Sequence, residues 1–249
     1  MCRLVDIFTD PMKYHLSIVI PAYNEEKRLP FTLRNTIDFL KTQPYEAEII
    51  VVNDGSKDKT ATLAGSFNKE LQSLRVIGYP QNRGKGFAVK TGMLEAEGEH
   101  RLFMDADYAV PIEYAKKFLA AINNHDKIII GSRALKGSII ESRQQFLREK
   151  FAQIFNVLQR FVLSLPIKDT QCGFKLFSRN ITEKLFSQIT YDCAYFDTEL
   201  LYIAYRSGIP IEEIPVKWKH DMETRLPIGF SRSLDLVNKL FRIKKIHRI

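Results

Sequence analysis

Short apolar segments alternate with longer amphipathic ones through the first half of the chain. Five short runs, rich in β-branched and other apolar residues, are predicted strands: 15–20, 48–52, 74–78, 101–104 and 127–131. Four segments with the apolar spacing of a helix lie between them: 25–41, 56–71, 87–96 and 112–124. Strands joined through helices form right-handed βαβ units. The pattern therefore predicts an α/β fold with a mostly parallel sheet flanked by helices.

The second half of the chain has fewer predicted strands and ends in amphipathic helices. The predicted elements are strands at 172–177 and 211–218, and helices at 143–165, 196–207 and from 231 onward. No linker-like stretch separates two units, so we expect one domain over residues 1–249. Within it, the change of pattern divides an α/β half, 12–135, from a second half, 136–249.

Positive charge is unevenly placed along the chain. The formal net charge is +8, and the segments 143–165 and 231–249 carry +3 and +5 of it. A localised excess of Lys and Arg marks faces that meet something anionic. Both segments also carry apolar stripes, which suit packing on the sheet, binding a partner or lying in a lipid headgroup layer.

Composition predicts a folded protein without a membrane span. Apolar residues make up 45% and charged residues 27% of the chain, which is ordinary for a globular domain. No window approaches 18 uninterrupted apolar residues, and the N-terminus lacks the pattern of a signal peptide. Three cysteines, at no metal-like spacing, favour a reducing compartment, so we expect a cytoplasmic protein.

The strand at 101–104 runs into two aspartates, Asp105 and Asp107, with Ala106 between them. Alternate residues of an extended segment point to the same side, so both carboxylates can converge just beyond the strand. Hard divalent cations such as Mg²⁺ and Mn²⁺ prefer carboxylate oxygens and often share them with substrate phosphates. The pair predicts a metal–diphosphate site, although an Asp-x-Asp at a strand end also suits a turn or a helix cap.

Polar motifs follow the three preceding strands as well. After the first comes Pro21-Ala-Tyr-Asn-Glu25, in which Tyr23 offers a ring for stacking a base. Asp54 ends the second strand, and after the third the glycines flanking Lys85 let the backbone approach an anion. Each motif alone suits an ordinary turn. Together they meet at the carboxyl edge of a parallel sheet, which is where open α/β folds bind ligands.

Four longer motifs carry a resemblance to a known family. They are Asn24-Glu-Glu-Lys-Arg-Leu-Pro30, Asn82-Arg-Gly-Lys-Gly86, Gly131-Ser-Arg133 and Asp169-Thr-Gln-Cys-Gly-Phe-Lys-Leu-Phe177. With the polar motifs above, they make the chain resemble the family 2 glycosyltransferases of the GT-A fold. The resemblance is to the branch of dolichyl-phosphate β-glucosyltransferases and polyprenyl-phosphate glycosyltransferases. It runs from about Leu16 to Trp218, and the Asp169–Phe177 stretch is its most specific part.

The resemblance implies roles for individual residues. Donor binding is implied for Pro21, Ala22, Tyr23, Glu25, Asp54, Lys85, Asp105, Ala106 and Asp107. The implied catalytic set is Asp105, Asp107, Arg133 and Lys175. The acceptor phosphate is assigned to Arg133, Arg148 and Arg225. Asp105 and Asp107 would hold Mg²⁺ or Mn²⁺. Mannosyltransferase relatives have a metal-binding Gln two residues beyond the second aspartate, whereas this chain has Ala109, which leaves the coordination number open.

The implied reaction moves a sugar, glucose in the first instance, from a UDP-sugar to a polyprenyl phosphate. Half 12–135 would bind the nucleotide-sugar and half 136–249 the acceptor. The acceptor phosphate is mostly dianionic at neutral pH, because its second pKa is about 6, so it needs no strong general base. In-line attack on an α-linked donor would give a β-linked product. The amphipathic helices would then attach the protein peripherally to the cytoplasmic face of a membrane.

Several alternatives stay open at this stage. A related enzyme could use GDP-mannose, or a sugar hydroxyl as acceptor, which would require a base such as Asp169 or Glu199. A nucleotidyltransferase would need a Gly-rich, Arg-containing loop after the first strand, and Pro21–Glu25 is not one. A nucleic-acid binder would explain the basic segments, but no aromatic residues are interleaved with basic ones on a sheet face, so we expect no nucleic-acid partner.

Overall fold

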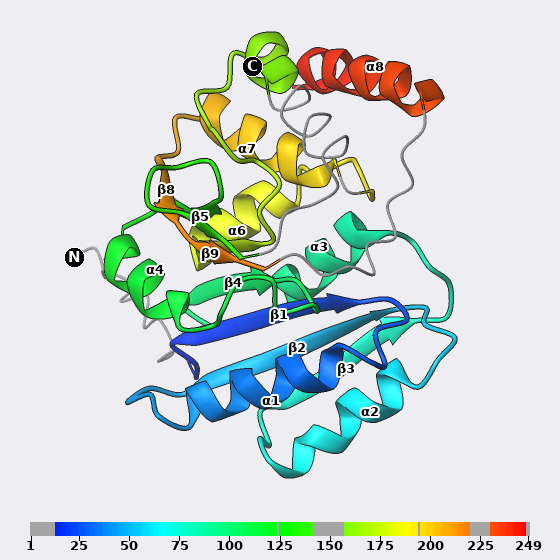
Figure 1. Cartoon of the computed structure of the whole chain (residues 1–249), viewed down its shortest axis with the longest axis vertical. Helices are drawn as coiled ribbons and strands as arrows, with labels where there is room; N and C mark the ends of the chain where they lie inside the picture. Colours follow the sequence, from blue (N-terminus) through cyan, green and yellow to red (C-terminus); the bar gives the residue numbers. More distant parts are fainter. Residues whose placement is uncertain (1–12, 124, 142–156, 194, 220–229, 248–249) are drawn as a thin grey trace, which may run out of the picture.

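The computed structural model describes residues 13–123, 125–141, 157–193, 195–219 and 230–247. For residues 230–237 it describes only the backbone. Its centre is a seven-stranded sheet in the order β3-β2-β1-β4-β7-β5-β8 (Figure 1). The strands are β1 (Leu16–Ala22), β2 (Ala47–Asp54), β3 (Leu74–Tyr79), β4 (His100–Met104), β5 (Ile128–Ser132), β7 (Phe174–Ser178) and β8 (Ile211–Pro215). All neighbouring pairs are parallel except those of β7, which is antiparallel to both β4 and β5. The predicted α/β fold with a mostly parallel sheet is confirmed.

Helices cover both faces of this sheet (Figure 1). They are α1 (Leu29–Leu40), α2 (Thr60–Ser66), α3 (Lys85–Glu95), α4 (Tyr114–Ile122), α6 (Arg179–Phe186), α7 (Phe196–Arg206) and α8 (Phe230–Ile246). One buried apolar cluster lies on each face of the sheet. Ile18 of β1 packs in the cluster of α1 and α4, whereas its neighbour Val19 packs in the cluster of α3, α6 and α7. The clusters follow from side-chain alternation, because successive strand residues point to opposite faces.

The structure departs from the predicted pattern at three places, two of them in the second half. α6 was not predicted, although Ser178 supplies its N-cap by accepting a hydrogen bond from the Ile181 amide at 3.4 Å. The predicted strand 211–218 divides at Val216 into β8 and the short β9 (Lys217–Trp218), which pairs with β6 (Ile139–Ile140). The predicted helix 56–71 is the shorter α2 followed by a 3₁₀ turn at Phe67–Lys69. The C-terminal helix is confirmed as α8.

The antiparallel strand β7 determines what lies at the end of β4. Met104 is in register with Phe174, and one step further the Asp105 amide donates to the Gly173 carbonyl at 3.0 Å. The start of β7 therefore meets the end of β4 at the carboxyl edge of the sheet. One sheet includes strands from both predicted halves of the chain, and the assignment of donor and acceptor to those halves stays a prediction.

The amphipathic helix predicted at 143–165 is described only in part. Residues 142–156 lie outside the described residues, and 157–163 are helical. None of the described helices is both long enough and apolar enough to cross a membrane.

Candidate active site

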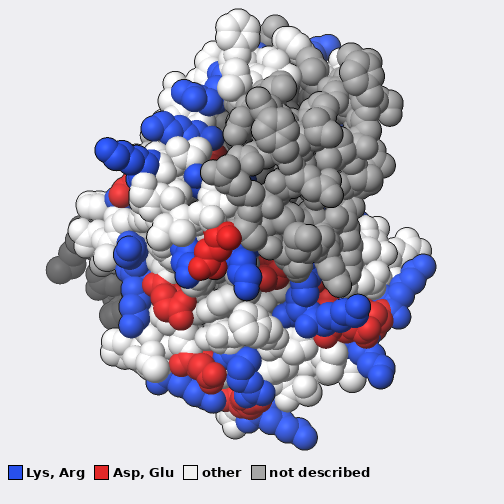
Figure 2. Space-filling model, viewed as in Figure 1, with Lys and Arg blue, Asp and Glu red and all other residues white. Residues whose placement is uncertain are grey.

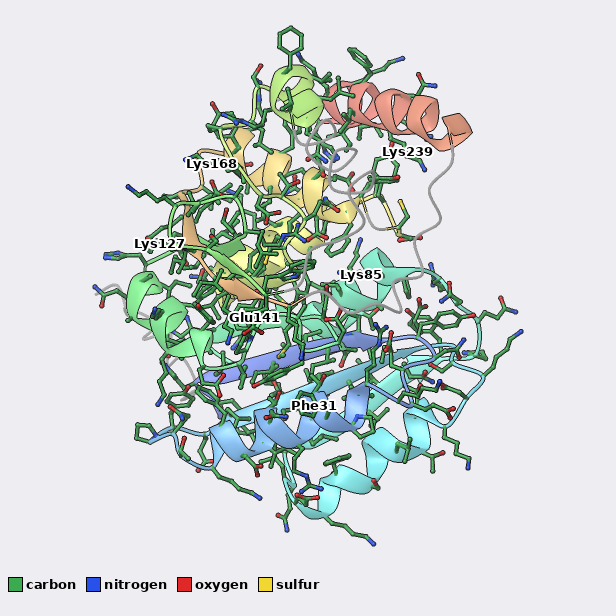
Figure 3. All side chains as sticks on the ribbon, in the orientation of Figure 1. Phe31, Lys85, Lys127, Glu141, Lys168 and Lys239 are labelled. Carbon is green, nitrogen blue, oxygen red and sulfur yellow. The ribbon has the colours of Figure 1, made fainter. Side chains whose placement is uncertain are left out.

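A cleft of about 410 Å³ opens at the carboxyl ends of the parallel strands. All nine predicted donor residues line it: Pro21, Ala22, Tyr23, Glu25, Asp54, Lys85, Asp105, Ala106 and Asp107. They come from the ends of β1, β2 and β4 and from the first turn of α3, where Figure 3 labels Lys85. The prediction that the four polar motifs meet at one edge of the sheet is therefore confirmed.

Two loops that form one wall of the cleft are tied to each other. Asn24 has a left-handed backbone (φ 54°), and its side-chain oxygen accepts from the Lys57 amide at 2.8 Å. The Glu25 amide donates to the Thr60 hydroxyl at 2.7 Å, and the Glu25 carboxylate pairs with Arg28. The loops after β1 and β2 therefore hold Tyr23, which is 37% exposed, at the cleft.

Asp54 serves as a turn residue and a cleft residue at the same time. Its buried carboxylate accepts from the amides of Arg83 and Gly84, at 2.7 and 3.0 Å, and from the Asn82 side chain at 2.9 Å. Gly84 adopts φ 102°, a conformation that favours glycine. Asp54 thus fixes the loop that precedes Lys85, while its own side chain lines the cleft.

The acidic pair lies at the base of the cleft with one cation beside it. Lys85 Nζ is 2.6 Å from Asp105 Oδ1. Asp107 Oδ1 accepts from the Ala109 amide at 3.0 Å, and the alanine at 109 has no side chain that could bind a metal. Burial and the neighbouring charge of Asp105 raise the pKa of Asp107 to about 6. Two carboxylates that repel each other at the end of a strand fit a divalent cation, because its charge would relieve the repulsion.

Of the residues predicted to act on the phosphates, the described Arg133 and Lys175 do not line this cleft. Arg133 forms a bidentate ion pair with buried Asp169, at 2.7 and 2.8 Å, and its guanidinium lies 5.2 Å from the centre of the Trp218 ring. Lys175 is fully buried and pairs with Asp197 at 2.5 Å. Arg148 and Arg225 lie outside the described residues. The acceptor-phosphate roles of these arginines therefore stay predictions.

Neither of the two candidate bases, Asp169 and Glu199, lines the cleft. Burial raises the pKa of Asp169, but the Arg133 guanidinium more than offsets this and holds that pKa below its ordinary value. Buried Glu199 accepts from the Thr190 and Tyr191 amides, at 3.0 and 2.9 Å, and lies 2.8 Å from His247 Nε2. Both carboxylates are committed to structural partners, which disfavours the hydroxyl-acceptor alternative.

Sequence reasoning missed several residues of the site. Arg28, Asn82, Gly84 and Ala88 also line the cleft. Arg28 and Asn82 belong to two of the motifs that carry the family resemblance, so the sequence could have indicated both as residues of the site. Nothing in the sequence indicated a special role for Asp197, because a carboxylate in the first turn of a helix is ordinary.

The mostly parallel sheet with an acidic cleft at its carboxyl edge is the architecture of the GT-A fold. The fold is shared with glucosyl-3-phosphoglycerate synthase from Mycobacterium tuberculosis, solved in complex with Mn²⁺, UDP-glucose and glycerol 3-phosphate. The TM-score is 0.66 at 18% sequence identity, covering 95% of this chain and 81% of the other.

Sequence comparison identifies the family. The family model for glycosyl transferase family 2 matches residues 17–186. A dolichyl-phosphate beta-glucosyltransferase of Drosophila melanogaster is 41% identical over 223 residues, 84% of this chain and 68% of the relative. The protein of that name in Homo sapiens is 39% identical over 228 residues, 86% of this chain and 70% of the relative. The chain belongs to glycosyl transferase family 2, in the dolichyl-phosphate β-glucosyltransferase branch, as the sequence motifs predicted.

Proposed function

We propose that the protein transfers glucose from UDP-glucose to a dolichyl-type polyprenyl phosphate and gives a β-linked product. The observation that carries this proposal is the convergence of all nine predicted donor residues on one cleft with an acidic pair at its base. The choice of glucose and of a dolichyl-type acceptor is supported by relatives of that name at 36–41% identity over most of this chain.

Asp105 and Asp107 would hold the divalent cation, Mg²⁺ or Mn²⁺, which supplies Lewis-acid stabilisation of the diphosphate leaving group. Tyr23 and the loop after β1 would seat the uracil, and Lys85 adds positive charge beside the diphosphate. A phosphate dianion is already a nucleophile. The chain therefore has to align it in line with the bond that breaks and neutralise charge, without supplying a base. Arg133, with Arg148 and Arg225, is proposed to meet the acceptor phosphate.

Donor identity is tested by thermal unfolding with a panel of nucleotide-sugars. UDP-glucose with Mn²⁺ at about 100 times its dissociation constant should stabilise the fold by about 2.7 kcal/mol, which raises Tm by roughly 5–10 °C for a chain of this size. UDP-glucose should give the largest shift in the panel. Greater stabilisation by GDP-mannose would move the protein to the mannosyltransferase branch.

We propose that the protein meets its lipid acceptor at a membrane surface through the helix at 157–163 and α8. Val157 and Phe161 are 66% and 85% exposed, and Phe241 of α8 is 57% exposed. The two helices lie side by side in Figure 1, and Lys244 Nζ donates to the Val162 carbonyl at 3.1 Å. Exposed aromatic side chains beside basic residues suit the headgroup layer of an anionic membrane.

Charge elsewhere on the visible surface is mixed. Figure 2 shows Lys and Arg interspersed with Asp and Glu over the lower half of the molecule, where Figure 1 places α1 and α2. The mixed charge agrees with the sequence, in which the excess of positive charge is confined to segments 143–165 and 231–249. The lower half therefore has no electrostatic field of a single sign. The choice of the cytoplasmic face stays a prediction from the sequence.

Membrane attachment is tested by co-sedimentation with phosphatidylglycerol vesicles. The wild-type protein should bind at low salt and less in high salt, because each basic residue near the surface contributes roughly 1 kcal/mol. The double variant Phe161→Ser/Phe241→Ser should bind at least about tenfold more weakly, since each buried Phe contributes about 1.5–3 kcal/mol.

Phe31→Ser is the matched control for this test. Phe31 is 61% exposed on α1, at the end of the molecule away from α8 (Figure 3). This variant should sediment with vesicles like the wild type. A wild-type protein that stays in the supernatant at low salt would show that the lipid is reached by another surface.

A further inference from the structure

A buried charge pair lies directly behind the acidic cleft. Lys175 and Asp197 are both almost completely inaccessible, and Lys175 Nζ lies 2.5 Å from Asp197 Oδ1. The same ammonium donates to the Cys172 carbonyl at 2.7 Å. Burial raises the pKa of Asp197 although Lys175 opposes the shift. A buried charge is costly unless it is paired, so each of these two groups depends on the other.

Strand register brings Lys175 close to Asp105. Phe103 of β4 is paired with Lys175 of β7, and the Asp105 amide bonds the Gly173 carbonyl. Phe103 and Asp105 alternate to the same side, as do Lys175 and Gly173, so Lys175 and Asp105 are diagonal neighbours across the two strands. Diagonal neighbours in a sheet lie within reach of a long side chain. Because residue 173 is glycine and has no side chain, the Asp105 carboxylate occupies the place where a Cβ of residue 173 would lie.

The helix that carries Asp197 is anchored to the turn that carries Lys85. The Gly86 amide donates to the Asp192 carbonyl at 2.8 Å, and a Cβ built at Gly86 would lie 2.8 Å from Cβ of Phe196. Lys85 Nζ and Lys175 Nζ lie 5.7 and 5.0 Å from the centre of the same Phe103 ring. Two ammonium groups therefore lie near one ring, and each is paired with a carboxylate, Lys85 with Asp105 and Lys175 with Asp197. Of these four residues, Lys85 and Asp105 line the cleft.

We infer that Asp197 is a positioning residue for the donor site: it is the counter-ion that keeps Lys175 from drawing the Asp105 carboxylate away from the cleft. The inference rests on the proposed function, because it assumes that Asp105 serves a metal–nucleotide complex. Without Asp197, the Lys175 ammonium would have the diagonal carboxylate of Asp105, already paired with Lys85, on the neighbouring strand. An ion pair formed there would compete with a divalent cation for the same oxygens.

The test is calorimetric titration of the full chain with UDP, in Mn²⁺ and in EDTA. Asp197→Asn keeps the size of the side chain and removes its charge. It should weaken UDP binding in Mn²⁺ by about tenfold or more, the usual effect of losing a group that orients a metal ligand. Binding in EDTA should change far less. Adding Lys175→Met to Asp197→Asn removes the unpaired ammonium and should recover most of the lost affinity.

Glu199→Gln is the matched control, because Glu199 is a fully buried carboxylate on the same helix that bonds Thr190, Tyr191 and His247 instead. It should retain the Mn²⁺-dependent affinity. If Asp197→Asn behaves like Glu199→Gln, or if the added Lys175→Met weakens binding further, the inference is overturned.

Two further outcomes of this experiment have a defined interpretation. If the wild type binds no UDP in Mn²⁺, the proposed function itself fails, which separates that failure from one of Asp197. If Asp197→Asn alone does not fold, the variant with both substitutions takes its place, since removing both members of a buried pair is tolerated better than removing one. That folded variant should bind UDP with Mn²⁺, and the inference is wrong if it does not.

Discussion

Replacing Asp107 by alanine should remove the metal-dependent part of UDP binding and lower glucosyl transfer by at least about 100-fold. Asp107 and Asp105 are the acidic pair that lines the cleft, and Ala109 contributes only a backbone amide beside them. No neighbouring ligand side chain at position 109 compensates for the loss of Asp107. Titration with UDP in Mn²⁺ and in EDTA separates the metal-dependent affinity from the rest.

The same substitution should leave the metal-free fold intact or stabilise it. Burial and Asp105 raise the pKa of Asp107 to about 6, above the ordinary value of an aspartate. The ionised carboxylate is therefore disfavoured in the folded state, and its contribution to stability falls as pH rises toward and through that pKa. At pH 7 its removal should leave Tm of the metal-free protein unchanged or higher.

Two controls complete this experiment. Asp107→Asn keeps the acceptor for the Ala109 amide and removes the charge, so it should fold normally and still lose most of the metal dependence. Asp126→Asn removes an exposed carboxylate that accepts from Ser178 at the far end of β7, and it should bind UDP like the wild type. Equal affinity of wild type and Asp107→Ala in Mn²⁺ would exclude Asp107 as a metal ligand.

The cleft at the carboxyl edge of the sheet could be predicted from the sequence because its geometry is local. Each motif directly follows a strand whose apolar pattern is plain, and parallel strands bring their carboxyl ends to one edge. Once the first four strands were assigned, the positions of Tyr23, Asp54, Lys85 and Asp107 followed from chain direction alone. Connections between these strands are helical, which fixes the direction of each strand.

The rest of the site depends on pairings between distant parts of the chain. β7 is antiparallel to both β4 and β5, and no periodicity in the sequence encodes this pairing. The Arg133–Asp169 pair joins the end of β5 to the segment before β7, and the Lys175–Asp197 pair joins β7 to α7. The family resemblance implied roles for Arg133 and Lys175, but the partner of each is a tertiary feature.

The Asp169–Phe177 motif contains a glycine whose reason becomes visible only in the structure. A Cβ built at Gly173 would fall on the carboxylate of Asp105, and the backbone of Gly173 is not in the left-handed region. Glycine is therefore required here for space and not for conformation. The obstructed group is the end of a side chain, which can rotate away, so the fold can absorb an added methyl group at the expense of the position of Asp105.

Gly173→Ala should accordingly separate function from stability. Moving Asp105 off its rotamer costs about 1 kcal/mol, and alanine recovers about 0.4–1 kcal/mol by restricting the unfolded chain, so Tm should change by no more than roughly 4 °C. UDP affinity in Mn²⁺ should nevertheless fall by at least about tenfold, because Asp105 no longer lies where the cleft holds it. Thermal unfolding and calorimetry on the same preparation measure both quantities.

Gly65→Ala is the matched control for Gly173→Ala. Gly65 lies in α2, where a Cβ would meet nothing within 4 Å. Alanine should therefore stabilise the helix by roughly 0.5–1 kcal/mol and leave UDP binding unchanged. If Gly173→Ala binds UDP with Mn²⁺ as tightly as Gly65→Ala does, the cleft does not depend on the carboxylate of Asp105. The metal would then have to be held by Asp107 without it. A loss confined to Gly173→Ala, with both variants folded, would instead show that the start of β7 sets the position of the first aspartate of the pair.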